Sequence, residues 1–238
     1  MTTVLAIYRR ELQSYFNTPL AYIVVPVFLL LVGLFSLFLN DIFDAGLATM
    51  RTVFFWCAMW FLLLVPALTM RLFAEEKRTG SLELLVTLPV TEGQLVLGKY
   101  LAALTLILIA LGLTITYPLT LASLGDLDWG PVIGGYLGLT LMAAAYTAIG
   151  TAASSFTSNQ IVAFLVASVV CVVPYVLGFF LHAVPAGMLP LVQYISFDYH
   201  FNGLARGVVD SRNLVFYVST IALFLHIAVF SLEQRRLS

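Results

Sequence analysis

Six uncharged, apolar stretches divide this sequence, and each is close to the roughly 20 residues that an α-helix needs to cross a lipid bilayer. They are residues 20–39, 52–70, 100–124, 132–153, 161–181 and 214–232. Only 10% of the 238 residues are charged and 61% are hydrophobic, whereas a soluble domain carries about 25% charged residues. The sequence therefore predicts an all-α membrane protein with a single transmembrane domain, residues 1–238.

The first 17 residues have the pattern of an amphipathic helix that lies in the membrane interface. Apolar side chains such as Val4, Leu5 and Tyr8 recur at helical spacing, while Arg9 and Arg10 fall mostly on the other side. A secretory signal peptide is the competing interpretation. It is disfavoured because the following apolar run is too long for a signal sequence and has no small-residue cleavage site after it.

Lysine and arginine are distributed unevenly between the two sides of the membrane. With six spans both termini lie on one side, which holds eight of the 11 basic residues and leaves three on the other. The eight are Arg9, Arg10, Arg71, Lys77, Arg78, Lys99, Arg235 and Arg236, and the three are Arg51, Arg206 and Arg212. Because the more basic side stays in the cytoplasm, we expect both termini to be cytoplasmic. The formal net charge of −1 gives no basis for nucleic-acid binding.

One charged segment, residues 71–95, separates the second span from the third. Its charged residues are Arg71, Glu75, Glu76, Lys77, Arg78, Glu83 and Glu92. Residues 71–79 continue the preceding helix, and Gly80 can end it, because glycine accepts the left-handed conformation found at helix C-termini. Ser81 can then cap a short cytoplasmic helix over residues 81–88.

This short helix has the features of a docking element. Leu82 contributes to its apolar side, and Glu83 lies in its first turn, where the helix dipole favours an anion. Pro89 stops it, and Thr91 with Gln94 forms a capping box for the next span. A capped, amphipathic helix held between two membrane spans is suited to docking on a soluble partner.

The outer segment between the fifth and sixth spans, residues 182–213, is too long to be an unstructured loop. Asp198 can cap a short helix there, and Arg206 and Asp210 are further charged residues of the segment. Its apolar content predicts short helices that dip back between the spans, where protein or water must satisfy the backbone.

Two patterns resemble catalytic or nucleotide-binding motifs but favour simpler interpretations. Gly93, Gly98 and Lys99 match a phosphate-binding loop except that Tyr100 stands where Ser or Thr should hold magnesium, and no soluble α/β body surrounds them. We interpret Lys99 as the cytoplasmic edge of the third span, reaching toward lipid headgroups. An intramembrane serine protease has little support, because no G-x-S-x-G sequence occurs.

His226 is the only ionisable residue well inside a span. Such a group is a candidate for function. With no charged partner in any span, a neutral histidine bonded to a neighbouring helix is the favoured interpretation.

Small residues in two spans allow helices to approach closely. Gly134 and Gly138 form G-x-x-x-G in the fourth span, and Ala163, Ala167 and Cys171 form a ridge in the fifth. Packing within one chain and contact with a second subunit remain open for both. Ala163 and Ala167 are our candidate contacts with a second permease.

With these features placed, the whole chain resembles the permeases of ABC-type-2 exporters, the type V exporter fold. EEKRTGSLELLVTLPV, residues 75–90, is similar to the coupling-helix stretch of that family. SFDYHFNGLARGVVDSRN, residues 196–213, is similar to the segment before the last span in permeases of the gliding-motility and nitrous-oxide-reductase-maturation kind.

The resemblance implies that this chain is not itself an enzyme and that two copies of a separate ATPase subunit bind ATP and magnesium. It also implies a bacterial or archaeal inner membrane and a second permease, identical or homologous. An accessory protein with an extracytoplasmic domain remains open, as does the cargo. The implied ATPase-coupling residues are Glu75, Glu76, Lys77, Arg78, Gly80, Ser81, Leu82, Glu83, Arg9 and Arg10.

Two other functions compete with an ATP-driven exporter. A secondary carrier, which works without an ATPase, usually has ionisable groups or broken helices at the middle of the membrane, and only His226 qualifies. A membrane scaffold that transports nothing is the third possibility. Co-purification with an ATPase would separate the first function from the other two.

Overall fold

Helices account for all regular secondary structure in the computed structural model, which describes residues 2–38, 49–81, 90–185 and 187–237. Six helical segments are long and apolar enough to cross a membrane. They are Pro19–Ser36, Arg51–Thr79, Glu92–Leu124, Trp129–Phe156, Gln160–Ala183 and Ser211–Gln234. The predicted all-α fold with six spans is therefore confirmed, and each span begins within eight residues of its expected start.

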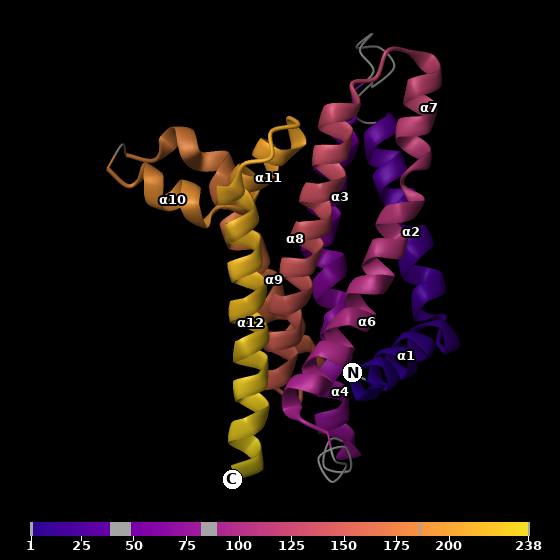
Figure 1. The fold of residues 1–238 in the computed structure, drawn as a ribbon, viewed down its shortest axis with the longest axis vertical. Helices are drawn as coiled ribbons and strands as arrows, with labels where there is room; N and C mark the ends of the chain where they lie inside the picture. The colour runs from indigo at the N-terminus through magenta and orange to yellow at the C-terminus, as the bar shows by residue number, and fades with distance from the viewer. Residues whose placement is uncertain (1, 39–48, 82–89, 186, 238) are drawn as a thin grey trace.

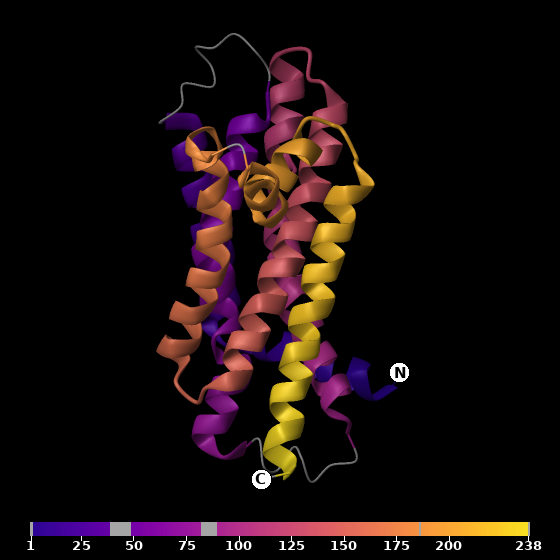
Figure 2. The same ribbon diagram turned by 90° about the vertical axis from the view of Figure 1, so that its left-hand side faces the viewer.

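The helix α8 (Trp129–Phe156) forms the centre of the bundle. It contacts four other spanning helices, which surround it in Figures 1 and 2. These are α3 (Arg51–Thr69), α6 (Glu92–Leu113), α9 (Gln160–Leu177) and α12 (Ser211–Leu237). The sixth, α2 (Pro19–Phe38), packs on α3 and α6. Only 22% of the most apolar window is buried in each of α2, α9 and α12, against 72% in α8, so these three present broad apolar surface.

Glycines in α8 allow its neighbours to pack at backbone distance. A Cβ atom built on Gly135 would overlap the ring of Phe54 in α3, and one built on Gly150 would overlap Thr69. Gly134 and Gly138 face α11 (Phe197–Ala205) in the same way. The G-x-x-x-G pair therefore packs within the chain.

The third span is broken near its outer end. The helix α6 stops at Leu113, and α7 (Thr116–Leu124) starts three residues later. Pro118 explains the break. Proline has no backbone N–H to donate, and in a regular helix its ring would clash with the carbonyl oxygen of Thr114, four residues earlier. At the break, the Thr114 hydroxyl donates a hydrogen bond to the Leu111 carbonyl at 2.6 Å and lies 3.0 Å from the Tyr136 hydroxyl.

Two shorter helices lie at the end of the bundle where both ends of the chain are found (Figure 1). These are α1 (Thr2–Asn17) and α4 (Arg71–Thr79), which continues α3 after an interruption at Met70. The predicted N-terminal helix and the predicted extension of the second span are both confirmed.

The fifth span ends in η1 (Gly178–Ala183), and the described part of the outer segment then forms two short helices, α10 (Leu189–Ile195) and α11, as a segment of this length predicts. Ser196 caps α11 by accepting a hydrogen bond from the Tyr199 amide, so the prediction that Asp198 is the cap was wrong. Asp198 is buried two residues further on. Burial raises the pKa of its carboxyl above the ordinary value, against the effects of Asn202 and Arg51.

The alanines proposed as subunit contacts lie inside the chain. Ala163 is 1% exposed and Ala167 is fully buried, as is Cys171, on the side of α9 that packs on α3 and α8. Because nothing outside the chain can reach them, the interpretation as contacts with a second permease gives way to packing within the monomer. The opposite side of α9 carries larger exposed residues, among them Leu165 and Val169.

Candidate functional site

A buried lysine joins three helices at the end of the bundle that contains both termini. Lys99, in the second turn of α6, is 1% exposed. Its ammonium group lies 2.7 Å from Glu11 Oε1 in α1 and 2.8 Å from Glu76 Oε1 in α4. The expected position of Lys99 among lipid headgroups was therefore wrong, because two carboxylates from distant parts of the chain pair with it.

The contact between α1 and α6 is close beside this lysine. A Cβ atom on Gly98 would lie 2.7 Å from Cγ2 of Ile7, so a larger residue there would push α1 away. The Tyr8 hydroxyl lies 3.2 Å from the Thr105 hydroxyl one to two turns further along α6. Gly98 and Lys99 therefore serve helix packing and charge pairing, which explains their spacing without a bound phosphate.

A serine of α8 bonds to the backbone at the junction between α3 and α4. The hydroxyl of Ser154 accepts hydrogen bonds from the amides of Phe73 at 2.9 Å and Ala74 at 3.1 Å. The same hydroxyl donates to the Met70 carbonyl at 2.9 Å. Buried backbone groups must find hydrogen-bond partners, so Ser154 holds the start of α4 against α8.

The backbone carbonyl of the next residue, Ser155, accepts hydrogen bonds from two other helices. It accepts a hydrogen bond from the ammonium group of Lys77 in α4 and another, of 2.9 Å, from the Ser231 hydroxyl in α12. The end of α8 therefore holds α4 and the end of α12 together. Movement of α4 relative to the bundle would strain the contacts of both Ser154 and Ser155.

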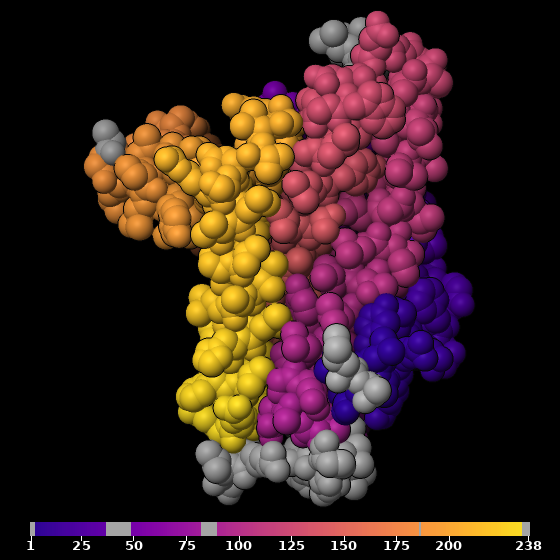
Figure 3. Space-filling view, in the orientation of Figure 1, coloured from indigo at the N-terminus to yellow at the C-terminus, as the bar shows by residue number. Residues whose placement is uncertain are grey.

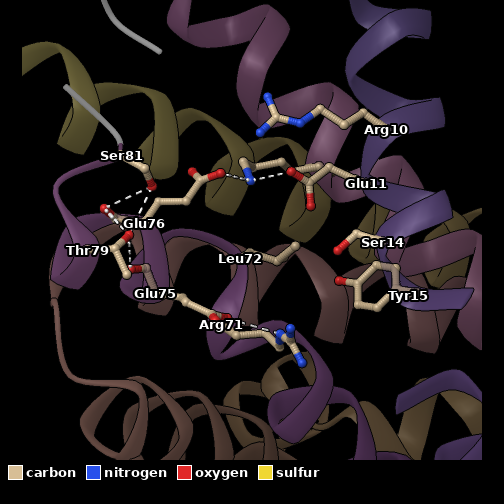
Figure 4. Close-up of a pocket in the computed structure, with 11 residues that line it drawn as sticks. Arg10, Glu11, Ser14, Tyr15, Arg71, Leu72, Glu75, Glu76, Thr79 and Ser81 are labelled. Atoms are coloured by element: carbon tan, nitrogen blue, oxygen red, sulfur yellow. Dashed lines mark hydrogen bonds and ion pairs between the residues drawn. The ribbon is translucent and has the colours of Figure 1, made fainter. Parts of the chain in front are cut away.

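Lys99, Glu11 and Glu76 form what we call the Lys99 cluster. A hollow of about 280 Å³ opens between α1 and α4 beside this cluster (Figure 4). Arg10 and Tyr15 border it from α1, and Arg71, Glu75 and Glu76 border it from α4. Two of its buried atoms, the Tyr15 hydroxyl and Glu76 Oε2, have no hydrogen-bond partner among the described residues. Burial raises the pKa of the Tyr15 phenol above its ordinary value.

The structure divides the predicted coupling residues into an inner and an outer group. Glu76 and Lys77 point inward, whereas Arg78 is exposed and Glu75 pairs with Arg71 at 3.2 Å in a partly exposed ion pair. Arg9 and Arg10 are exposed on α1. Among the predicted coupling residues that the structure describes, Arg9, Arg10 and Arg78 are therefore the exposed charges.

Gly80 and the capping box were predicted correctly. Gly80 ends α4 in the left-handed conformation, with φ of 73°. Thr91 accepts from the Gln94 amide while Gln94 accepts from the Thr91 amide, so the box before α6 is complete. Ser81 is described, and its hydroxyl lies 3.0 Å from that of Thr79. Leu82, Glu83 and the rest of the predicted short helix lie outside the described residues.

His226 differs from its favoured interpretation. It is exposed on α12, and no hydrogen bond links it to any other residue that the structure describes. Within the same residues, no group of three or more histidine, cysteine or acidic side chains could hold a metal ion.

Sequence comparison connects this arrangement to known proteins. A family model described as ABC-2 family transporter protein matches residues 40–232, well over half of the chain. A comparison with the curated proteins found no match.

Proposed function

The chain belongs to the ABC-2 transporter family, and from this premise we propose that it is the permease of an exporter driven by a separate ATPase subunit. ATP and magnesium would bind to that ATPase. The substrate would cross between the permease spans as they alternate between inward-open and outward-open states. This chain would contribute the membrane path and the surface on which the ATPase docks.

The Lys99 cluster carries the proposal. It joins α1, α4 and α6. In the sequence, α4 precedes and α6 follows residues 82–89, the stretch that resembles a coupling helix. A push on this stretch would reach α6 through the pairing of Glu76 with Lys99, and α8 through Ser154 and Ser155. Packed helices respond to such a push by moving as rigid bodies, so closure of an ATPase could tilt the spans.

The proposed orientation places α1, α4 and both termini in the cytoplasm. It rests on the eight-to-three distribution of basic residues across the two ends of the bundle. The exposed Arg9 and Arg10 of α1 would then lie near anionic lipids of the inner leaflet. The source would be a bacterial or archaeal cell membrane.

We further propose that two permease subunits and two ATPase subunits form the transporter. One chain provides a single docking stretch, whereas two ATPases closing on ATP present two docking surfaces. The exposed apolar sides of α2, α9 and α12 offer the area that a second permease and lipid would cover.

Affinity purification from the native membrane tests this function. We expect a tagged copy of the chain to bring down a protein with ATPase activity, and native mass spectrometry to find two permeases and two ATPases. Untagged cells provide the control. Recovery of the intact permease without any ATPase would favour the secondary carrier or the scaffold, and a single permease per complex would refute the assembly.

A further inference from the structure

The end of the bundle opposite to the chain termini contains a larger pocket, of about 630 Å³, formed by α10, α11 and the start of α12. In Figure 3 the lobe that contains α10 projects from the side of the bundle beside the upper part of α12. Residues that border the pocket include Tyr194, Tyr199, Arg206, Arg212 and Val215. No predicted function of the chain uses this pocket.

A buried histidine fixes the walls of the pocket relative to one another. The ring of His200, which is 4% exposed, lies with Nδ1 2.8 Å from Asn213 Oδ1 in α12 and Nε2 3.1 Å from the Tyr194 carbonyl in α10. It also stacks on Phe216 with 4.1 Å between ring centroids. One side chain of α11 therefore holds α10 and α12 in place.

The helix α11, which forms one wall of the pocket, is tied to the bundle. A Cβ atom on Gly134 would overlap the carbonyl oxygen of Leu204, so the end of α11 lies directly on the backbone of α8. The Tyr217 hydroxyl donates to the Phe197 carbonyl at 3.2 Å, which joins α12 to the start of α11. The pocket is thus preformed, and a ligand would find its shape already in place.

The chemistry of the lining combines two cations with apolar surface. Arg206 and Arg212 are two of the three basic residues at this end, and neither has an acidic partner within 4.0 Å among the described residues. Among the described residues that line the pocket, Asp210 has the only carboxylate, and it accepts a hydrogen bond from the backbone amide of Arg212 at 2.9 Å. Val215 and Tyr194 are each 61% exposed.

We propose that this pocket binds an amphiphile that carries a phosphate group. Arg206 and Arg212 would bind the phosphate, because guanidinium groups match its geometry with paired hydrogen bonds. The exposed faces of Tyr194, Val208 and Val215 would cover the apolar part of the same molecule. The proposal rests on the membrane fold of the chain and does not depend on an ATPase.

Binding of short-chain lipids to the purified full chain in uncharged detergent tests the proposal. Dihexanoyl phosphatidylglycerol should bind saturably with one site per chain. The affinity of the variant Arg206→Gln/Arg212→Gln for this lipid should be lower by about tenfold or more. Arg51→Gln, the matched control, removes the third arginine of this end, which does not line the pocket, and should leave binding unchanged.

Two further arms separate the possible sources of the phosphate. Inorganic phosphate should fail to compete at the concentration at which the lipid saturates, because it lacks the apolar part; equal competition would show a simple anion site and overturn the proposal. Equal loss of binding in the Arg51→Gln control would also overturn it, as would unchanged binding in the double variant. A thermal unfolding curve like that of the wild type shows that the double variant is folded.

Discussion

Replacement of Lys99 by methionine is expected to lower the free energy of unfolding by about 3–5 kcal/mol, the usual effect of removing one partner from a buried ion pair. Lys99 is almost fully buried and pairs with both Glu11 and Glu76, whose side chains are 19% and 17% exposed. Methionine fills a similar volume but leaves two carboxylates facing each other without a cation. Their repulsion should release α1 from α6.

Equilibrium unfolding in mixed micelles measures the change, and hydrogen exchange along α1 shows where it acts. Arg78→Met is the matched control, since it removes an exposed cation of the same segment and should change stability little. Adding Glu11→Gln and Glu76→Gln to Lys99→Met should recover much of the loss, because the unpaired charges are gone. Wild-type exchange of α1 in Lys99→Met would show that these ion pairs do not hold the helix.

Replacement of Gly80 by valine is expected to reduce the amount of ATPase recovered with the permease about tenfold, while the chain remains in the membrane. At φ of 73° a β-branched residue is strained by about 1–3 kcal/mol. Apart from its chain neighbours, no atom of the described residues lies within 4 Å of a Cβ built there, so the expected strain comes from the backbone conformation. The turn should relax by redirecting the stretch that follows, residues 82–89, which we propose as the ATPase contact.

Gly80→Asn separates conformation from side-chain size. Asparagine tolerates the left-handed region far better than valine, so it should recover ATPase at a level closer to that of the wild type. Quantitative immunoblotting of membranes and of purified complexes gives both quantities. If Gly80→Val recovers as much ATPase as the wild type, or is itself lost from the membrane, Gly80 has no specific role in coupling.

The local features of this fold were predictable from the sequence. Span lengths follow from the thickness of the bilayer, and the N-terminal helix follows from apolar residues at helical spacing. Gly80 and the Thr91–Gln94 box were also predictable, since each depends on the conformation of a few neighbouring residues. In the outer segment the length of the chain indicated helices, but Ser196 and Asp198 are both good caps and only the structure distinguishes them.

The contacts that build the site were not predictable, because they join residues far apart in the sequence. Lys99 is 88 residues from Glu11, and Ser154 is 80 from Ala74. A lysine at the end of a span looks the same whether it faces lipid headgroups or a carboxylate. The small ridge with Ala163 and Ala167 was equally ambiguous, because close packing needs small residues both within a chain and between chains.

Photo-crosslinking from position 81 tests most directly whether the end of α4 docks on an ATPase. A photoreactive amino acid replaces Ser81, and a second strain carries it at Asp126, which is exposed in the loop between α7 and α8. We expect position 81 to form an adduct with an ATP-hydrolysing subunit in intact cells and position 126 to form none with it. The absence of that adduct at position 81, or the same adduct at position 126, would contradict both the docking and the orientation proposed for this permease.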